Sequence, residues 1–323
     1  MLYATGELPA VSSLAPAGED FGVDLQPLAG GMSGETWLTE YAGERAVLRI
    51  YGGRSRRRGP GASEVDAAVL AWLAGLLPVP RVLEVRRGEP DADLPAVLVT
   101  SYLPGVLLAD LKPTLDDVGQ ARVGQSLGTL LGRIAHVALP RAGLFHDPDL
   151  GIDPMPGVLR DLTLWTERAV PALIGWDEAE LVGLRSLAAE AQALLDEAAL
   201  RTCLVHSDLN PKNVLVDPAT LRVTGLLDWE FAHAGSPYTD LGNLLRLDRE
   251  PAFAEAVLAA REAFVPDPRP DALELARASD LFALVDLATR REENPVAARA
   301  DALLHAVART GDLHARAVAG PGT

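Results

Sequence analysis

Polar and apolar residues alternate near the amino-terminal end of the chain, a pattern that is typical of β-strands. Residues 36–41 alternate, Ala42 and Gly43 mark a turn, and an apolar segment follows at Ala46–Tyr51. A turn this short joins neighbouring strands that run in opposite directions. The pattern therefore predicts an antiparallel sheet in this region, and not a β-α-β unit.

The apolar spacing then changes to that of a helix. Apolar residues recur at intervals of three and four along residues 65–76, and Pro78 and Pro80 follow, so the helix is expected to end before Pro78. Two further strands are predicted at residues 82–87 and 96–102.

Beyond Pro104 and Gly105 the apolar positions follow the spacing of long amphipathic helices. These are predicted at residues 115–138, 158–174 and 177–199, and from Asp240 to the end with a break near residues 265–270. We therefore expect an α+β fold with two lobes. A small antiparallel-sheet lobe is expected at residues 1–101, a hinge at 102–105 and a larger, mainly helical lobe at 106–323.

Composition narrows the classes of protein that remain. The chain has 323 residues and a formal net charge of −16, which argues against nucleic acid or an anionic membrane as a partner. A single cysteine, Cys203, excludes an internal disulfide framework, and its apolar neighbours predict a buried thiol. No signal peptide or membrane-spanning pattern is present, so a cytoplasmic protein, monomeric or homodimeric, is expected. The basic run Arg54–Arg58 is interpreted as a solvated loop.

Polar residues interrupt an apolar segment at residues 204–216, which read LVHSDLNPKNVLV. Leu204 with Val205, and Val214–Val216, predict two short strands joined by a tight loop. A self-capped turn would also explain the polar residues of this loop. It would not explain Asp228, which ends another apolar strand fifteen residues after Asn213.

This set of side chains suits phosphoryl transfer. That reaction needs a carboxylate to orient the attacking hydroxyl and accept its proton, and oxygen ligands for a Mg²⁺ ion that bridges the nucleotide phosphates. Asp208 fits the first role, and Asn213 and Asp228 fit the second. His206, which belongs to the same catalytic loop, is expected to pack and support the backbone and not to carry a proton.

The segments LVHSDLNPKNVLVD and GLLDWEFAHAGSPYTDL resemble the catalytic and metal loops of the aminoglycoside phosphotransferase family. The segments GGMSGETW, AVLRI and DAAVLAWLA precede them in the expected order, so the resemblance extends over most of the chain. It implies a bilobal, protein-kinase-like fold, with Mg²⁺ as cofactor and ATP or GTP as co-substrate. It also implies an acidic residue at a helix start, matched by Asp240, for which we expect an N-cap role.

The resemblance further implies a nucleotide site in the small lobe. The residues that it assigns to the phosphates are Gly30, Gly31, Ser33, Gly34 and Arg49, and those that it places at the hinge beside the purine are Ser101, Tyr102 and Leu103. Arg49 stands where the protein-kinase pattern has lysine, and both lysines of the chain lie beyond residue 105. Asp66 on the following helix is its expected acidic partner, with Glu64 as the alternative.

We therefore expect a small-molecule kinase that acts on an antibiotic, aminoglycoside-like or otherwise cationic, and so confers resistance. A cationic acceptor is suggested by the excess of acidic residues beyond the hinge, where Asp280 and Asp286 lie in an apolar helix. The alternatives are a metabolic kinase for choline, an amino acid, a sugar or a fructosamine, and a nucleotide-binding pseudokinase that acts as an interaction module. A protein kinase is disfavoured because Asp228-Trp229-Glu230 replaces the DFG sequence and no APE sequence follows.

Overall fold

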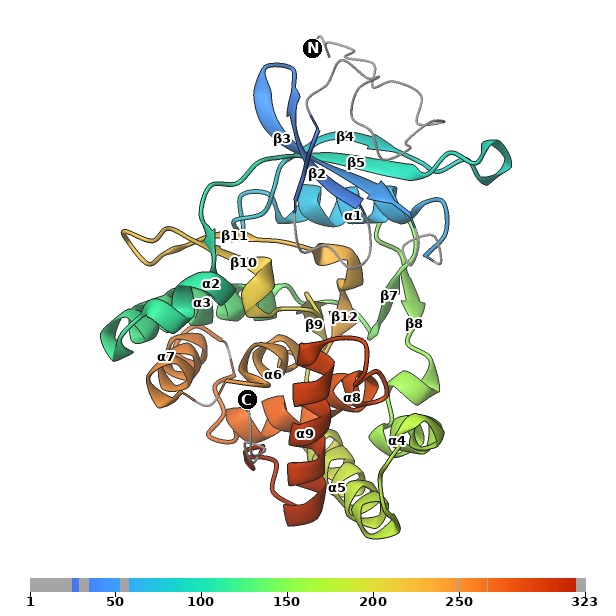
Figure 1. Ribbon diagram of the computed structural model, residues 1–323, viewed down its shortest axis with the longest axis vertical. Coiled ribbons are helices and arrows are strands. Elements are labelled where there is room, and N and C mark those ends of the chain that lie inside the picture. Colours follow the sequence, from blue (N-terminus) through green and yellow to red (C-terminus); the bar gives the residue numbers. More distant parts are fainter. Residues whose placement is uncertain (1–24, 29–34, 53–57, 249, 266, 318–323) are drawn as a thin grey trace.

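The structure is a computed structural model, and it describes residues 25–28, 35–52, 58–248, 250–265 and 267–317. A five-stranded antiparallel sheet lies at one end of the molecule and helices fill the other (Figure 1). The order of its strands is β1-β2-β3-β5-β4. They are β1 (Gln26–Pro27), β2 (Glu35–Tyr41), β3 (Glu44–Tyr51), β4 (Val82–Arg86) and β5 (Ala96–Ser101).

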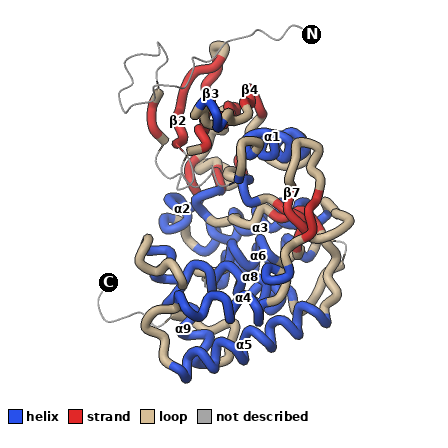
Figure 2. Tube along the Cα trace, turned by 90° about the vertical axis from the view of Figure 1, so that its right-hand side faces the viewer, coloured by secondary structure: helices blue, strands red, loops and turns tan. Residues whose placement is uncertain are grey.

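Helix α1 (Ala62–Leu73) packs against this sheet on the side that faces the helices, as both views show (Figures 1 and 2). The helix begins and ends about one turn earlier than its apolar spacing predicts. Gly75 adopts φ +83°, a left-handed conformation that favours glycine, and the chain turns there. Leu76 consequently lies outside the helix and is half exposed.

A short three-stranded sheet carries the chain from the small sheet into the helical part. β6 (Val106–Leu107) pairs with β10 (Val214–Val216), and β10 pairs with β11 (Val223–Leu226). Gly105 precedes β6 at φ +143°, and a Cβ atom there would lie 2.7 Å from the Thr224 hydroxyl. Only glycine fits at position 105, where the chain passes close to β11. This close contact keeps the small sheet near the β10-β11 hairpin.

The rest of the helical part contains α2 to α9 and a four-stranded sheet. The helices are α2 (Leu108–Leu111), α3 (Asp117–His136), α4 (Leu162–Ala169), α5 (Glu178–Glu197), α6 (Thr239–Leu245), α7 (Pro251–Glu262), α8 (Ala272–Ala288) and α9 (Pro295–Thr310). The sheet has the order β8-β7-β12-β9, with β7 (Gly143–Phe145), β8 (Ile152–Pro154), β9 (Cys203–Val205) and β12 (His233–Gly235).

Proline accounts for the differences between these helices and the predicted ones. The helix expected at residues 158–174 is reduced to α4, because Pro171 lies in the 3₁₀ turn that follows it. One break was expected in the helical segment after Asp240. The structure has two more, because Pro251 and Pro295 each begin a new helix. None of the helices in the described ranges is both long and apolar enough to cross a bilayer.

Helices α3 and α7 approach each other closely along a row of glycines. A Cβ atom on Gly124 would lie 2.8 Å from the Phe253 carbonyl oxygen, and one on Gly128 would collide with the Val257 carbonyl. The same apolar core continues from α3 through β10 to α6. The strands that carry the polar loops are therefore held on a tightly packed base.

Candidate active site

Two loops that are distant in the sequence meet where β10 and β11 pair. We call them the Asp208 loop (residues 206–213) and the Asp228 loop (residues 228–231). The antiparallel register aligns Val214 with Leu226, and the Leu227 N–H donates to the Asn213 carbonyl at 2.8 Å. Asp228 therefore follows directly beside Asn213, so the hairpin itself brings the predicted side chains together.

His206 supports both loops. Its side chain is fully buried, with Nε2 donating to the Leu227 carbonyl at 2.7 Å and Nδ1 accepting the Asp208 N–H at 3.3 Å. The ring also packs on Trp229, with 4.5 Å between the ring centroids. Because both nitrogens are bonded to the backbone, His206 has no free site for a transferred proton, as its expected packing role requires.

Asp208 is held by two amides from its own loop. Asn210 donates to one carboxylate oxygen and Asn213 to the other, each at 2.9 Å. Burial raises the pKa of Asp208, and the nearby negative charge of Asp228 raises it further, while the bonds from both asparagines lower it. The loop thus orients a carboxylate whose oxygens retain lone pairs for a further donor.

Asn213 and Asp228 have the donor atoms that Mg²⁺ prefers. Asn213 uses its Nδ2 on Asp208, which leaves Oδ1 as a possible ligand, and the Asp228 side chain is 27% exposed. The described residues contain no group of three or more His, Cys, Asp or Glu side chains that could hold a metal. Two oxygen ligands are nevertheless sufficient for a Mg²⁺ ion that takes its other ligands from phosphates and water.

Asp240 has a different role from the one predicted. The expected N-cap would bond the start of its own helix, but its carboxylate accepts the N–H groups of His206 and Ser207, at 2.9 and 2.8 Å. Tyr238 occupies the N-cap position and makes no side-chain cap bond. Asp240 therefore ties α6 to the Asp208 loop, where Ser207 has a left-handed φ of +72°.

Arg49 is bound to the Asp228 loop and not to α1. Its guanidinium donates to Asp228 at 2.6 Å and to Glu230 at 2.7 Å. Burial lowers the pKa of Arg49, but the two carboxylates outweigh this effect and raise the pKa, so Arg49 is charged. The predicted pairing with Asp66 is wrong, and so is the alternative with Glu64, which pairs with Arg87 at 2.7 Å.

The physical reason is that Asp66 already has two other donors. The Tyr51 hydroxyl donates to it at 2.7 Å, and Arg58 binds both of its carboxylate oxygens, at 2.6 and 2.9 Å. Arg58 is largely buried, so its assignment to a solvated loop is wrong. The other residues of that basic run, which begins at Arg54, lie outside the described residues. The sequence analysis missed both Arg58 and Glu230, although Glu230 stands two residues after Asp228.

The predicted nucleotide-binding residues of the small sheet are only partly described. Gly30, Gly31, Ser33 and Gly34 lie outside the described residues. At the expected hinge, the Ser101 and Tyr102 N–H groups donate to the carbonyls of Arg81 and Arg45, at 2.8 and 3.1 Å. Within the described ranges the Leu103 N–H donates to no backbone carbonyl, unlike those of Ser101 and Tyr102.

The two acidic residues predicted for the acceptor differ in exposure. Asp280 is only 4% exposed and accepts two bonds from Arg246, at 2.6 and 2.8 Å. A buried carboxylate that is neutralised in this way is not open to a ligand, so its predicted substrate role is wrong. Asp286 is half exposed and pairs with Arg290 along the same helix.

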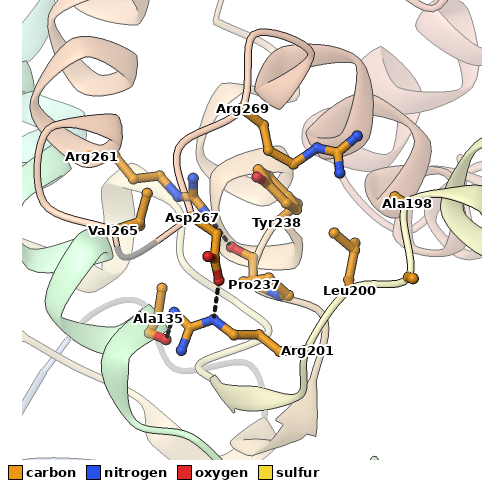
Figure 3. A pocket seen from close by; sticks show the side chains of 11 residues that line it. Ala135, Ala198, Leu200, Arg201, Pro237, Tyr238, Arg261, Val265, Asp267 and Arg269 are labelled. Carbon is orange, nitrogen blue, oxygen red and sulfur yellow. Dashed lines mark hydrogen bonds and ion pairs between the residues drawn. The ribbon is translucent and has the colours of Figure 1, made fainter.

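A cavity of about 210 Å³ is lined in part by Pro237 and Tyr238, which precede α6, and by no residue of the Asp208 or Asp228 loops (Figure 3). Three arginines line it, and each already bonds to protein. Arg201 donates to the Ala135 carbonyl at 2.6 Å, Arg261 to the Pro237 carbonyl at 2.7 Å, and Arg269 to Asp271. The Arg201 and Arg261 bonds connect separate segments of the chain, so we interpret the cavity as structural.

Cys203 lies in β9, immediately before the Asp208 loop. It is fully buried, and burial raises the pKa of its thiol to about 12. The thiol is therefore protonated at neutral pH, as its predicted packing role requires.

Comparisons with known proteins agree with this geometry. The model of the phosphotransferase enzyme family matches residues 24–276. Streptomycin 3''-kinase of Streptomyces griseus is 31% identical over 259 residues, which cover 73% of this chain and 88% of that protein.

Two solved structures share the fold. The GDP complex of wild-type aminoglycoside 2'-phosphotransferase-IIIa has a TM-score of 0.69 at 18% identity, covering 91% of this chain and 95% of that chain. A thermostable mutant of another aminoglycoside phosphotransferase, in a ternary complex with ADP and hygromycin B, has a TM-score of 0.64 at 22% identity, covering 90% and 95%.

Proposed function

The chain belongs to the phosphotransferase enzyme family, and we propose that it transfers the γ-phosphate of ATP or GTP to a hydroxyl group of a small antibiotic. It is a phosphotransferase with an alcohol acceptor. The observation that carries the proposal is the meeting of Asp208, Asn213 and Asp228 at one hairpin. The reaction takes place in the cytoplasm, where nucleoside triphosphates are available.

Asp208 orients the acceptor hydroxyl and takes its proton. Its two oxygens are fixed by Asn210 and Asn213, so the carboxylate loses little orientational freedom when the acceptor binds. Its raised pKa brings its basicity closer to neutral pH, where a general base is more effective. Asn213 Oδ1 and the Asp228 carboxylate would hold Mg²⁺, which when bound offsets the negative charge of the nucleotide phosphates.

Arg49 binds the phosphates from the side of the small sheet. Its Nε is buried and has no acceptor within the described residues, and one of its two carboxylate partners, Asp228, is the proposed metal ligand. The guanidinium can bind phosphate oxygens through two parallel bonds, which lysine cannot do. Nucleotide contacts are also proposed for the glycine-rich segment (Gly30, Gly31, Ser33 and Gly34) and for the hinge residues Ser101, Tyr102 and Leu103.

The acceptor is proposed to be cationic and aminoglycoside-like, so that its phosphorylation confers resistance. Two findings support this class. Streptomycin 3''-kinase shares 31% identity with the chain, and the formal net charge of −16 favours the approach of a cation. Among the acidic residues singled out in the sequence, Asp286 is the one whose exposure permits a contact.

The test is to incubate the purified protein with ATP or GTP, Mg²⁺ and a panel of hydroxyl compounds. The panel should contain aminoglycosides together with choline, amino acids, sugars and fructosamines. We expect acceptor-dependent release of nucleoside diphosphate with an aminoglycoside, slowed about 10²-fold or more in Asp208→Asn. Phosphorylation of a metabolite alone would establish a metabolic kinase, and nucleotide binding without any transfer would establish a pseudokinase.

A further inference from the structure

Arg49 is shared between two carboxylates that differ in their freedom to move. The Asp228 side chain is 27% exposed, whereas that of Glu230 is 1% exposed. If Asp228 turns towards a metal ion, Glu230 remains as the fixed partner of Arg49. A buried carboxylate is not easily left without its cation, because an unpaired buried charge is strongly unfavourable.

Tyr51 explains why α1 does not supply this partner. Tyr51 lies two residues after Arg49 on β3, so both side chains project from the same face of the sheet. The Arg49 guanidinium lies 5.2 Å from the centre of the Tyr51 ring, and the Tyr51 hydroxyl bonds Asp66. The tyrosine therefore occupies the path that a direct contact between Arg49 and α1 would need.

The connection between α1 and Arg49 passes through the Asp228 loop. Arg58 binds Asp66 of α1 and also lies 3.8 Å from the Glu230 carboxylate, which accepts a hydrogen bond from Arg49 at 2.7 Å. Among the described residues, Arg49 and Arg58 contact Asp66, Asp228 and Glu230 in one cluster. When Asp228 binds a metal, Glu230 still holds one side of the Arg49 guanidinium, and the side that contacted Asp228 is left for phosphate oxygens.

Building on the proposed function, we propose that Glu230 is the positioning residue that holds Arg49 in place for the nucleotide phosphates. In this arrangement Glu230, two residues after the proposed metal ligand Asp228, is the carboxylate that holds Arg49 of β3. Arg58 and Asp66 connect α1 to that carboxylate. Glu230 acts through Arg49 and contacts neither nucleotide nor acceptor.

The test uses the full chain with the isosteric variant Glu230→Gln, and it measures binding, so that it does not depend on the acceptor. Without the Glu230 charge, Asp228 becomes the sole carboxylate on Arg49 and is released less readily to a metal. We expect the dissociation constant of Mn²⁺, titrated at saturating ADP and followed by electron paramagnetic resonance, to rise about tenfold or more. The dissociation constant of ADP should rise too, and Glu230→Asp should recover part of both losses.

Glu64→Gln is the matched control, because Glu64 lies on α1 and pairs with Arg87 outside the cluster. It should leave both constants unchanged. Asp66→Asn tests the rival anchor directly. If Asp66→Asn weakens ADP binding and Glu230→Gln does not, or if Glu230→Gln lowers only the melting temperature, the proposal is overturned.

The two proposals fail in distinguishable ways. A wild-type protein that binds no nucleotide would remove both of them. A protein that binds ADP and responds to Glu230→Gln as expected, but phosphorylates no acceptor, would refute the proposed function and leave the role of Glu230 intact.

Discussion

Asp208 combines burial with two bonds from neighbouring amides, and its proposed role as base can be tested by removing its charge. Asp208→Asn should lower kcat about 10²-fold or more, since a positioned base contributes that much to proton transfer. The dissociation constant of the nucleotide should change by no more than a few fold, because the proposed role of Asp208 is to contact the acceptor and not the nucleotide. Steady-state kinetics and ADP titration measure the two effects, and Asp110→Asn, at an exposed position on α2, is the control. Undiminished kcat in Asp208→Asn would exclude the base role.

The pH dependence of the reaction should report the environment of Asp208. The base must be ionised, and burial raises its pKa above the usual value for aspartate of about 3.9. The rate should therefore fall as the pH drops through this raised pKa. Asn210 lowers the pKa by donating to the carboxylate, so Asn210→Ala should move the acidic limb of the kcat/KM profile to higher pH. A shift to lower pH, or none, would contradict the assignment.

At the scale of the elements, α6 holds the Asp208 loop through one carboxylate. Asp240→Asn leaves two backbone N–H groups of that loop facing an amide, which offers one acceptor oxygen in place of two. We expect a loss of about 1–3 kcal/mol in the free energy of unfolding, as for other charged hydrogen bonds, together with a lower kcat. Urea unfolding and steady-state kinetics measure these effects. Asp271→Asn, which removes a pair with Arg269 whose side chains are both about one-third exposed, should change stability much less.

The close contact of α3 and α7 makes a second prediction. Alanine favours a helix over glycine by about 1 kcal/mol, yet Gly128→Ala should destabilise the protein because the added methyl collides with the Val257 backbone. The expected net loss is about 1–3 kcal/mol, measured by chemical denaturation. Gln125→Ala, at an exposed position on the same helix, should be neutral or slightly stabilising. A stabilised Gly128→Ala variant would show that the two helices can separate at little cost.

Most elements follow from local pattern, and those that do not are short and depend on distant partners. The sheet strands, α1, α3, α5 and the strands around the Asp208 loop were predicted, because their spacing and turn residues act locally. β7, β8 and β12 have three residues each and become strands through pairing with one another and with β9. β9 and β10 are equally short, but continuous apolar residues indicate them, whereas β7, β8 and β12 contain glycine, proline or polar residues and lack such a run.

At the scale of the whole molecule, the resemblance to the aminoglycoside phosphotransferase family and the kinase-like fold are confirmed. The convergence of Asp208, Asn213 and Asp228 followed from their positions at strand ends. The partners of Arg49, Asp66 and Asp240 did not, because each depends on which donors or acceptors from distant segments lie within reach in the folded chain. Tyr51 decides the case of Asp66, because its hydroxyl bonds that carboxylate. The spacing of the sequence motifs does not indicate this bond.

The charge of the whole molecule predicts how an acceptor is captured. A cationic acceptor should have a kcat/KM that falls as salt screens the acidic surface. Asp286→Asn should raise acceptor KM and weaken this dependence, whereas Asp280→Asn should mainly lower stability, because it breaks a buried pair with Arg246. The measurement is kcat/KM over a range of ionic strength. A neutral or anionic best acceptor would refute the cationic class.

The arginine at position 49 also determines how the protein responds to covalent chemistry. Nucleotide analogues that acylate amines react with a neutral amine beside the phosphates. The Arg49 guanidinium stays protonated, so it does not react with them. The chain offers two lysine side chains, of which Lys112 is paired with Asp248 and Lys212 lies exposed in the Asp208 loop. A survey of cellular kinases that relies on labelling a lysine on β3 would therefore not detect this protein.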